Sequence, residues 1–406
     1  MHRRTSAATL LAAVVFVVLV ANAVSSRVAH VDGANGAGSG EARPLLAGFG
    51  GAVSPATFVP PSVFNPDGIV VDPITHTVFV TDRIQNLVLG ISDTTFGITS
   101  VAAVGDEPTD VAYDSGMGEI FVNNYNSNNV SVLSDTTGQV IATVAVGVNP
   151  QGVVYDPATS QVFVANHGSD NVSVIDDANN SVVAAIPVGV EPAHLAYDPV
   201  TGAVFVANHG SGNVSVIAAS SDEVIASVNA DAGARGIVYD PDLGEMFVTN
   251  RDANTVSVIA EGNDSVVATV PVGLDPVDAA YDSELQEVFV VNTESPSLSV
   301  IATANNTVVA TIPVGPYPFA AAYDSSQGLL FVTDSDCLYD YCAGTTGNIT
   351  VVSVTSDSIV AAIDPYSSPP PAPAGRSTAA APIPEIVLGA AAVTLAIAAL
   401  VWARRR

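Results

Sequence analysis

The 406-residue sequence contains no lysine: all 11 basic residues are arginine, against 40 acidic residues, and the net charge is −29. A surface this acidic repels phosphate backbones, which argues against nucleic acid as a partner. Aromatic residues make up only 6% of the chain, and the single tryptophan, Trp402, lies near the C-terminus. The sequence therefore lacks a tryptophan platform for a quinone, and it also lacks a Cys-x-x-Cys-His haem attachment motif.

Cysteine is nearly absent as well, and the two that occur, Cys337 and Cys342, lie five residues apart. Two neighbouring cysteines in an exported protein favour a disulfide. A zinc site would need about two further ligands nearby, and only Asp334, Asp336 and Asp340 are at hand. The sequence predicts a disulfide here, with a metal site as the alternative.

The N-terminus has the pattern of an export signal. Arg3 and Arg4 precede an apolar stretch at residues 7–20, and Ala-Asn-Ala at residues 21–23 has the form of a cleavage site. A signal peptide is predicted over residues 1–26, with an uncleaved anchor as the alternative. In either case the chain that follows is exported.

The C-terminus has the pattern of a membrane anchor. Residues 386–403 carry no charge and are followed by three arginines, which suits a helix that spans about 30 Å with its basic end inside. An anchor is predicted over residues 385–406, behind a stalk rich in Pro, Ala and Ser at residues 364–384. The preceding Pro-Glu pair resembles the sorting signals of PEF/PEP-type surface proteins, and this resemblance implies that the tail is processed. Residues 27–61 are expected to form a flexible leader.

Between these ends the sequence repeats with a period of 42 residues. A Phe-Val pair recurs at Phe79, Phe121, Phe163, Phe205, Phe247, Phe289 and Phe331. A second series, in which Asp always follows, is Val71, Tyr113, Tyr155, Tyr197, Tyr239, Tyr281 and Tyr323. Each unit reads as four short strands without helical periodicity, and a Gly-x-x-Pro segment joins most units. The sequence predicts an all-β seven-bladed propeller over residues 62–363.

Three segments of one unit resemble the YVTN family of β-propeller repeats. They are Phe-Val-Thr-Asn at 247–250, Thr-Val-Ser-Val-Ile at 255–259 and Ala-Thr-Val-Pro-Val-Gly at 268–273, with Phe in place of the leading Tyr. The family includes surface-layer and periplasmic proteins, so the resemblance implies the propeller fold and no shared catalytic residue. Two ways of closing the ring stay open: four strands per blade from 66–363 alone, or an added strand from residues 53–59.

The mouth of the central channel holds the candidate ligand residues. The position two residues after the crossover proline, or after Ala234 where one unit lacks that proline, holds Gly68, Asp110, Gly152, His194, Gly236, Asp278 and Ala320. Asp110, His194 and Asp278 fall on alternate blades, where they could converge on a cation or a small ligand. The favoured interpretation is that they are solvated mouth residues without a ligand, and convergence on a ligand is the alternative. His167 and His209 occupy equivalent repeat positions, which duplication of neighbouring units explains.

Seven Asn-x-Ser/Thr sequences are candidate glycosylation sites. They begin at Asn129, Asn171, Asn179, Asn213, Asn263, Asn305 and Asn348. Four of them, in blades 2, 3, 4 and 7, are expected on the Gly-x-x-Pro face. Glycans there would leave open a patch around residues 251–254 and 293–297, which we predict to face a partner.

These observations together predict an extracytoplasmic, membrane-anchored propeller that acts as a binding or cell-surface envelope protein without catalysis. No cofactor is expected, and calcium is the one candidate ion. The expected partner is a cell-envelope protein or glycan, and self-association is a further alternative. The competing hypothesis is an extracytoplasmic hydrolase or lyase that uses the channel mouth.

Overall fold

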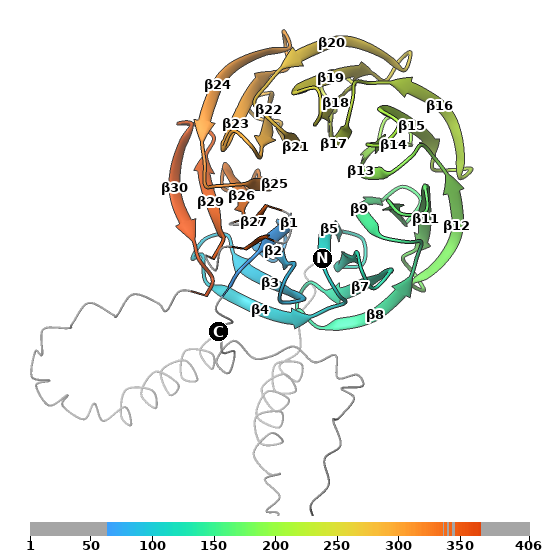
Figure 1. Cartoon of the computed structure of the whole chain (residues 1–406). Coiled ribbons are helices and arrows are strands. Elements are labelled where there is room, and N and C mark those ends of the chain that lie inside the picture. Colours follow the sequence, from blue (N-terminus) through green and yellow to red (C-terminus); the bar gives the residue numbers. More distant parts are fainter. Residues whose placement is uncertain (1–62, 336, 339–340, 343–345, 367–406) are drawn as a thin grey trace, which may run out of the picture. The chain divides into compact units, whose positions relative to one another are not determined.

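The computed structural model describes residues 63–335, 337–338, 341–342 and 346–366. These residues form a ring of seven four-stranded antiparallel sheets around a central channel (Figure 1). The all-β seven-bladed propeller predicted from the repeats is confirmed. The predicted signal segment, leader and C-terminal anchor, and most of the stalk, lie outside the described residues. Within the described ranges no helix is long and apolar enough to cross a membrane.

Each blade is built from one continuous segment, and its first strand lines the channel (Figure 1). The strands of blades 1 to 3 are β1 (Pro66–Asp72), β2 (Thr77–Asp82), β3 (Leu87–Ser92), β4 (Ile98–Ala103), β5 (Pro108–Asp114), β6 (Glu119–Asn124), β7 (Asn129–Ser134), β8 (Val140–Ala145), β9 (Pro150–Asp156), β10 (Gln161–Asn166), β11 (Asn171–Asp176) and β12 (Ser181–Pro187). Those of blades 4 and 5 are β13 (Pro192–Asp198), β14 (Ala203–Asn208), β15 (Asn213–Ala218), β16 (Glu223–Asn229), β17 (Ala234–Asp240), β18 (Glu245–Asn250), β19 (Thr255–Ala260) and β20 (Ser265–Pro271). Those of blades 6 and 7 are β21 (Pro276–Asp282), β22 (Glu287–Asn292), β23 (Ser297–Ala302), β24 (Thr307–Pro313), β25 (Pro318–Asp324), β26 (Leu329–Asp334), β29 (Asn348–Ser353) and β30 (Ser358–Ile363).

The repeated phenylalanine of the second strand forms the core between blades. All seven of these side chains are at most 1% exposed. Phe205, for example, packs with Met246 and Val248 of the next blade. Burial of one such side chain contributes about 1.5–3 kcal/mol. The Phe recurs every 42 residues because each blade needs one such side chain in its core.

The repeated aspartate of the first strand closes the turn to the second strand. In the third blade the Oδ1 atom of Asp156 accepts hydrogen bonds from the backbone N–H groups of Ala158 (2.7 Å) and Thr159 (3.4 Å). The residue four positions after this aspartate has a positive φ in every blade, at His76, Gly118, Ser160, Gly202, Gly244, Gln286 and Gly328. An aspartate that accepts hydrogen bonds from the backbone of its own turn stabilises that turn, which explains why Asp recurs at this position.

The ring closes between blades 7 and 1 by side-chain and backbone contacts, without a shared strand among the described residues. Phe64 is fully buried and meets the ring of Tyr366 edge to face, with centroids 5.2 Å apart. The Tyr366 hydroxyl donates to Asp82 Oδ2 at 2.6 Å. The Gly347 N–H donates to the Phe64 carbonyl oxygen at 2.7 Å. Tyr366 lies three residues beyond the predicted end of the propeller, and residues 53–59 lie outside the described part of the chain.

Substitution of Tyr366 is expected to loosen this seam. Tyr366→Phe removes the hydroxyl that donates a hydrogen bond to Asp82. This loss should lower the free energy of unfolding by about 1–2 kcal/mol. Tyr366→Ala also removes the ring and should cost more. Relative to the wild type, each variant should show a larger increase in the hydrogen-exchange rates of β1 and β30 than in those of β13 to β16. Equal effects on all blades would contradict a local role at the seam.

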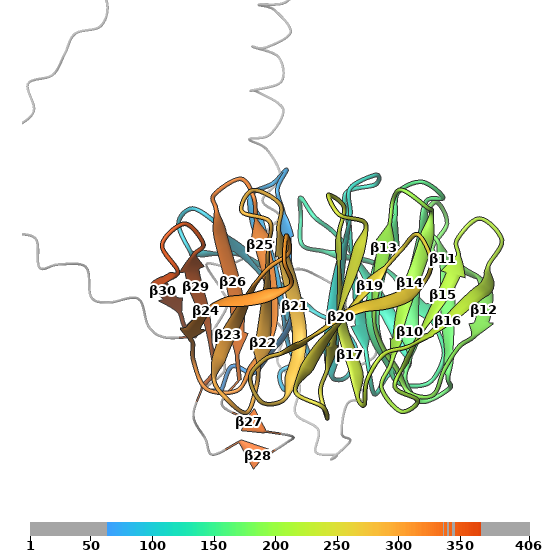
Figure 2. The ribbon, with the colours of Figure 1, turned by 90° about the horizontal axis from the view of Figure 1, so that it is seen from above.

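The two cysteines lie in a small hairpin between β26 and β29. In this hairpin, β27 (Cys337–Leu338) pairs with β28 (Tyr341–Cys342), and Cys337 is directly opposite Cys342. Figure 2 shows the hairpin projecting from one face of the ring. The cysteine side chains are not among those described, so the disulfide stays a prediction.

The predicted glycosylation sites differ in exposure. Asn129, Asn171, Asn213 and Asn348 are half-buried, whereas Asn179, Asn263 and Asn305 are exposed in outer hairpins. The half-buried ones begin third strands, and in blade 3 the Asn171 Oδ1 accepts a 2.8 Å hydrogen bond from Asn166 Nδ2. Glycosylation stays a prediction, and the outer-hairpin sites have the more accessible side chains.

Candidate functional site

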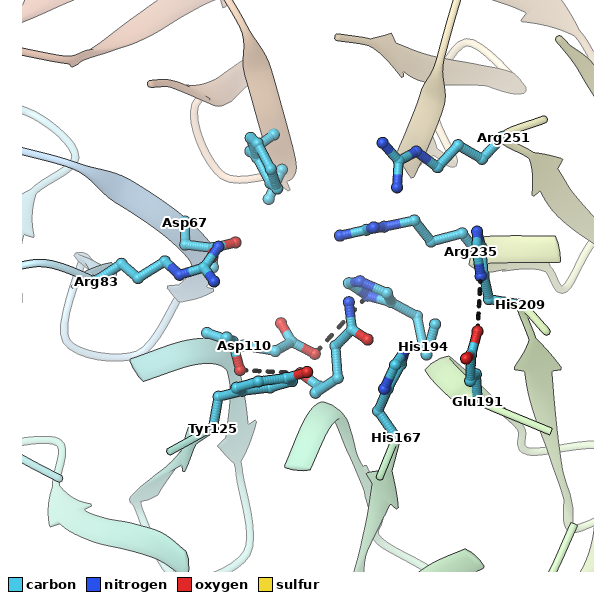
Figure 3. Close-up of a pocket in the computed structure, with 16 residues that line it drawn as sticks. Asp67, Arg83, Asp110, Tyr125, His167, Glu191, His194, His209, Arg235 and Arg251 are labelled. Carbon is cyan, nitrogen blue, oxygen red and sulfur yellow. Dashed lines mark hydrogen bonds and ion pairs between the residues drawn. The ribbon is translucent and has the colours of Figure 1, made fainter. Parts of the chain in front are cut away.

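A polar cavity of about 260 Å³ occupies one mouth of the channel (Figure 3). It lies on the face that carries the loops between second and third strands and the crossovers between blades, which is the face predicted for the ligand site. The residues lining it are Asp67, Gly68, Arg83, Thr109, Asp110, Tyr125, Gln151, His167, Glu191, Ala193, His194, His209, Arg235, Arg251, Phe319 and Ala320.

The repeat places all of these residues except Glu191 at three equivalent positions of the blade. One position follows the end of the second strand and holds Arg83, Tyr125, His167, His209 and Arg251. The other two are the first and second residues after the start of each inner strand. At the first of these three positions a backbone hydrogen bond recurs in every blade, from the residue's N–H to the carbonyl oxygen just before the inner strand, as from His209 to Glu191 (2.9 Å). The loop side chains are thereby held over the channel.

The cavity gathers nearly all the basic residues of the described chain. That part of the sequence contains three arginines, Arg83, Arg235 and Arg251, and all three line the cavity. Three of its four histidines, His167, His194 and His209, line it too. In a protein with a net charge of −29, this concentration marks the mouth as chemically distinct from the rest of the surface.

Two of the arginines are neutralised by acids from the following crossover. Arg83 Nε donates to Glu107 Oε1 at 2.7 Å, and its Nη1 lies 3.7 Å from Asp67 Oδ2. Arg251 Nη2 donates to Asp275 Oδ2 at 3.3 Å. Because the acid lies 24 residues after the arginine in both cases, the repeat itself sets the pairing.

Arg235 is different, because no hydrogen bond or ion pair joins its guanidinium to any described residue. Its Nε is buried without a partner, and its Cζ lies 5.8 Å from the ring centroid of Phe319. Burial, and secondarily the charge of Arg251, lowers the pKa of Arg235 to about 10. The side chain is therefore still charged at neutral pH and points into the cavity (Figure 3).

The predicted mouth residues Asp110 and Asp278 link neighbouring blades. Asp110 accepts 2.9 Å hydrogen bonds from the N–H groups of Val111 and, in the next blade, Val153. Asp278 likewise accepts a 3.0 Å hydrogen bond from Ala321 of the next blade. Burial raises the pKa of Asp110 to about 7 and that of Asp278 to about 6.

His194 faces Asp110 without forming an ion pair. The His194 Nδ1 to Asp110 Oδ2 distance is 3.9 Å, which is too long for a hydrogen bond. Burial, followed by the charge of Arg235, lowers the pKa of His194 to about 3. The imidazole is therefore neutral. It can donate a hydrogen bond to a ligand through one ring nitrogen and accept one through the other.

The structure does not gather the three predicted residues into a metal site. Asp110 and His194 line the cavity, but Asp278 does not. No group of three or more His, Cys, Asp or Glu in the described part of the chain could hold a metal ion. The sequence interpretation also missed Arg83 and Arg235, although the rarity of arginine was a usable signal, and it placed Arg251 only in the predicted partner-facing patch. It explained His167 and His209 by duplication alone, and both line the cavity.

Stability is expected to fall as the pH rises from about 5 to about 8. Burial raises the pKa of Asp82, Asp110 and Asp278 from 3.8 to about 6, 7 and 6. The folded state then binds more protons than the unfolded state, so the free energy of unfolding decreases with pH, by at most about 1.4 kcal/mol per pH unit for each group. The lowered pKa values of His167 and His194 oppose this trend at acid pH, but the three carboxyls outweigh them.

Urea unfolding across this range should show the slope, and Asp110→Asn should flatten it, mostly above about pH 6. Glu223→Gln, which changes an exposed carboxylate on an outer strand, is the matched control and should leave the slope unchanged. Stability that rises between pH 6 and 8 would contradict the prediction.

No family model matches the chain, and no curated protein matches its sequence. Solved structures do share the fold. Hydrazine synthase of Kuenenia stuttgartiensis aligns with a TM-score of 0.64 at 19% identity, over 73% of this chain and 98% of that chain. A streptogramin B lyase aligns with a TM-score of 0.58 at 13% identity, over 67% and 91%. The dihydro-heme d1 dehydrogenase NirN, in complex with DHE, aligns with 0.53 at 13% identity, over 74% and 66%. At these identities the likeness shows the propeller fold alone.

Proposed function

We propose that this protein is a non-catalytic binding propeller of the cell envelope, which takes its ligand at the channel mouth. The observation that carries the proposal is the convergence of all three arginines and three of the four histidines of the described chain on one cavity. A ligand pocket is expected to combine a concave shape with a few convergent polar groups. Here those groups come from neighbouring blades of a rigid ring, which suits recognition.

The proposed location is outside the cytoplasm, with the chain held at the membrane by residues 386–403. The basic, apolar and small-residue pattern of residues 1–26 supports export, and the uncharged stretch followed by three arginines supports the anchor. The proposed partner is an envelope glycan or an envelope protein.

Catalysis at the mouth is the second candidate, and one observation favours it. The pKa of Asp110, about 7, suits a general acid or base at neutral pH. Both oxygens of Asp110, however, already accept backbone hydrogen bonds from Val111 and Val153. That engagement fits a structural link between blades better than proton transfer.

The test is binding of the purified full-length protein to an array of envelope glycans and envelope proteins, with and without calcium. We expect saturable binding that is lost in Gln151→Trp, which fills the cavity. Ser356→Trp adds the same bulk at an exposed turn on the opposite face and should bind normally. An array without a hit, or unchanged binding by Gln151→Trp, would refute the proposal.

A further inference from the structure

The unpaired guanidinium of Arg235 identifies the kind of group the cavity accepts. Arg83 and Arg251 are held by Glu107 and Asp275, so Arg235 is the one arginine of the described chain that forms no direct ion pair. A guanidinium offers parallel N–H donors that match the two oxygens of an acid group. A buried donor left unsatisfied is costly, and an acid group of the ligand would remove that cost.

The wall opposite Arg235 identifies the rest of the ligand. Figure 3 shows Asp67 and Asp110 across the cavity from Arg235. Both side chains can accept hydrogen bonds, and in their ionised form they repel a second negative charge. A phosphate dianion is therefore disfavoured. A carboxylate monoanion that also carries hydroxyl groups can accept hydrogen bonds from Arg235 and donate hydrogen bonds to Asp67 and Asp110.

The size of the cavity sets the length of the ligand. At about 260 Å³ it lies just below the lower end of small-molecule pockets, about 300 Å³, which is enough for one ring-sized residue. Phe319 presents a ring beside Arg235. At the rim the rings of Tyr125 and His167 lie 6.3 Å apart. One residue of a larger chain could enter the mouth while the remainder stays outside.

We propose that the mouth binds a hydroxylated carboxylate in the form of a uronic acid residue of an acidic glycan, with Arg235 bound to the carboxylate and Asp67 and Asp110 accepting from hydroxyls. This inference rests on the proposed binding function and names its ligand class. It assigns the recognition of acid to a single arginine in a protein that otherwise repels anions.

Calorimetry on the full-length protein with D-glucuronate and D-galacturonate tests the assignment, with D-glucose, D-galactose and glucose 6-phosphate as comparison sugars. We expect the uronates to bind at least about tenfold more tightly than the neutral sugars and the phosphate. Arg235→Gln should lose about tenfold or more in affinity for the uronates. Arg235→Lys, which keeps the charge without the fork, should lose less.

The controls separate this inference from the broader proposal. Glu284→Gln removes an exposed charge on the opposite face and should bind uronates normally. Thermal unfolding of each variant shows that it is folded. Equal binding of neutral sugars and uronates, tighter binding of the phosphate, no uronate binding, or full uronate affinity in a folded Arg235→Gln would each overturn the uronate assignment. A hit elsewhere on the envelope array would still leave the binding function standing.

Discussion

Gly152→Ala is expected to lower the free energy of unfolding by about 3 kcal/mol or more. Gly152 lies in β9, on the wall of the channel. A Cβ atom there would lie 2.2 Å from the carbonyl oxygen of Ala193 and 2.7 Å from the Cα of His194. Both are backbone atoms of the next inner strand, so relief of the collision requires two blades to move apart.

Urea unfolding of the purified protein measures this effect, and Gly262→Ala is the matched control. Gly262 lies in an outer turn where an added Cβ meets nothing within 4 Å. We expect the control to unfold within about 0.5 kcal/mol of the wild type. Equal stability of the two variants would show that the inner strands can separate without cost.

Phe205→Ala is expected to cost about 3–5 kcal/mol. The Phe205 side chain is 1% exposed and packs across the boundary between blades 4 and 5 with Met246 and Val248. Truncation removes buried apolar area and leaves a cavity that the two sheets cannot close, because each sheet is also fixed to its other neighbour.

The comparison variants are Phe205→Leu, which should recover more than half of the loss, and Ile225→Ala in the same blade. Ile225 is 61% exposed on the outer strand and should change stability little. Thermal and urea unfolding give the values. A loss below about 1 kcal/mol for Phe205→Ala would mean that the blades do not depend on this packing.

The fold was predictable because its physical causes recur in register. The Phe core and the Asp turn repeat every 42 residues in all seven blades, the crossover glycine repeats in most of them, and each is a local requirement of one blade. The closure was not predictable in the same way. Phe64 and Tyr366 fall outside the repeat, so no periodic signal marks them. Their contact joins the first and last parts of the propeller sequence.

The sequence pointed to the channel mouth as the location of the candidate site, but not to most of the residues that line it. The position after the crossover proline did lead to the mouth, and Asp110 and His194 lie there. Asp278, at the equivalent position, is not among the residues that line the cavity. The decisive residue, Arg235, occupies the neighbouring position, where the other blades hold unlike residues. Its significance depends on the absence of an acidic partner, which only the three-dimensional arrangement shows.

The closure between blades 7 and 1 also has a mechanical consequence. Every other junction of the ring is bridged by a continuous chain, whereas this one is held by non-covalent contacts such as the Phe64–Tyr366 ring pair and the Tyr366–Asp82 hydrogen bond. A pulling force that enters through the chain after Tyr366 loads these contacts before it reaches any strand. Under tension blade 7 should therefore separate from blade 1 before any strand of the other blades is unfolded.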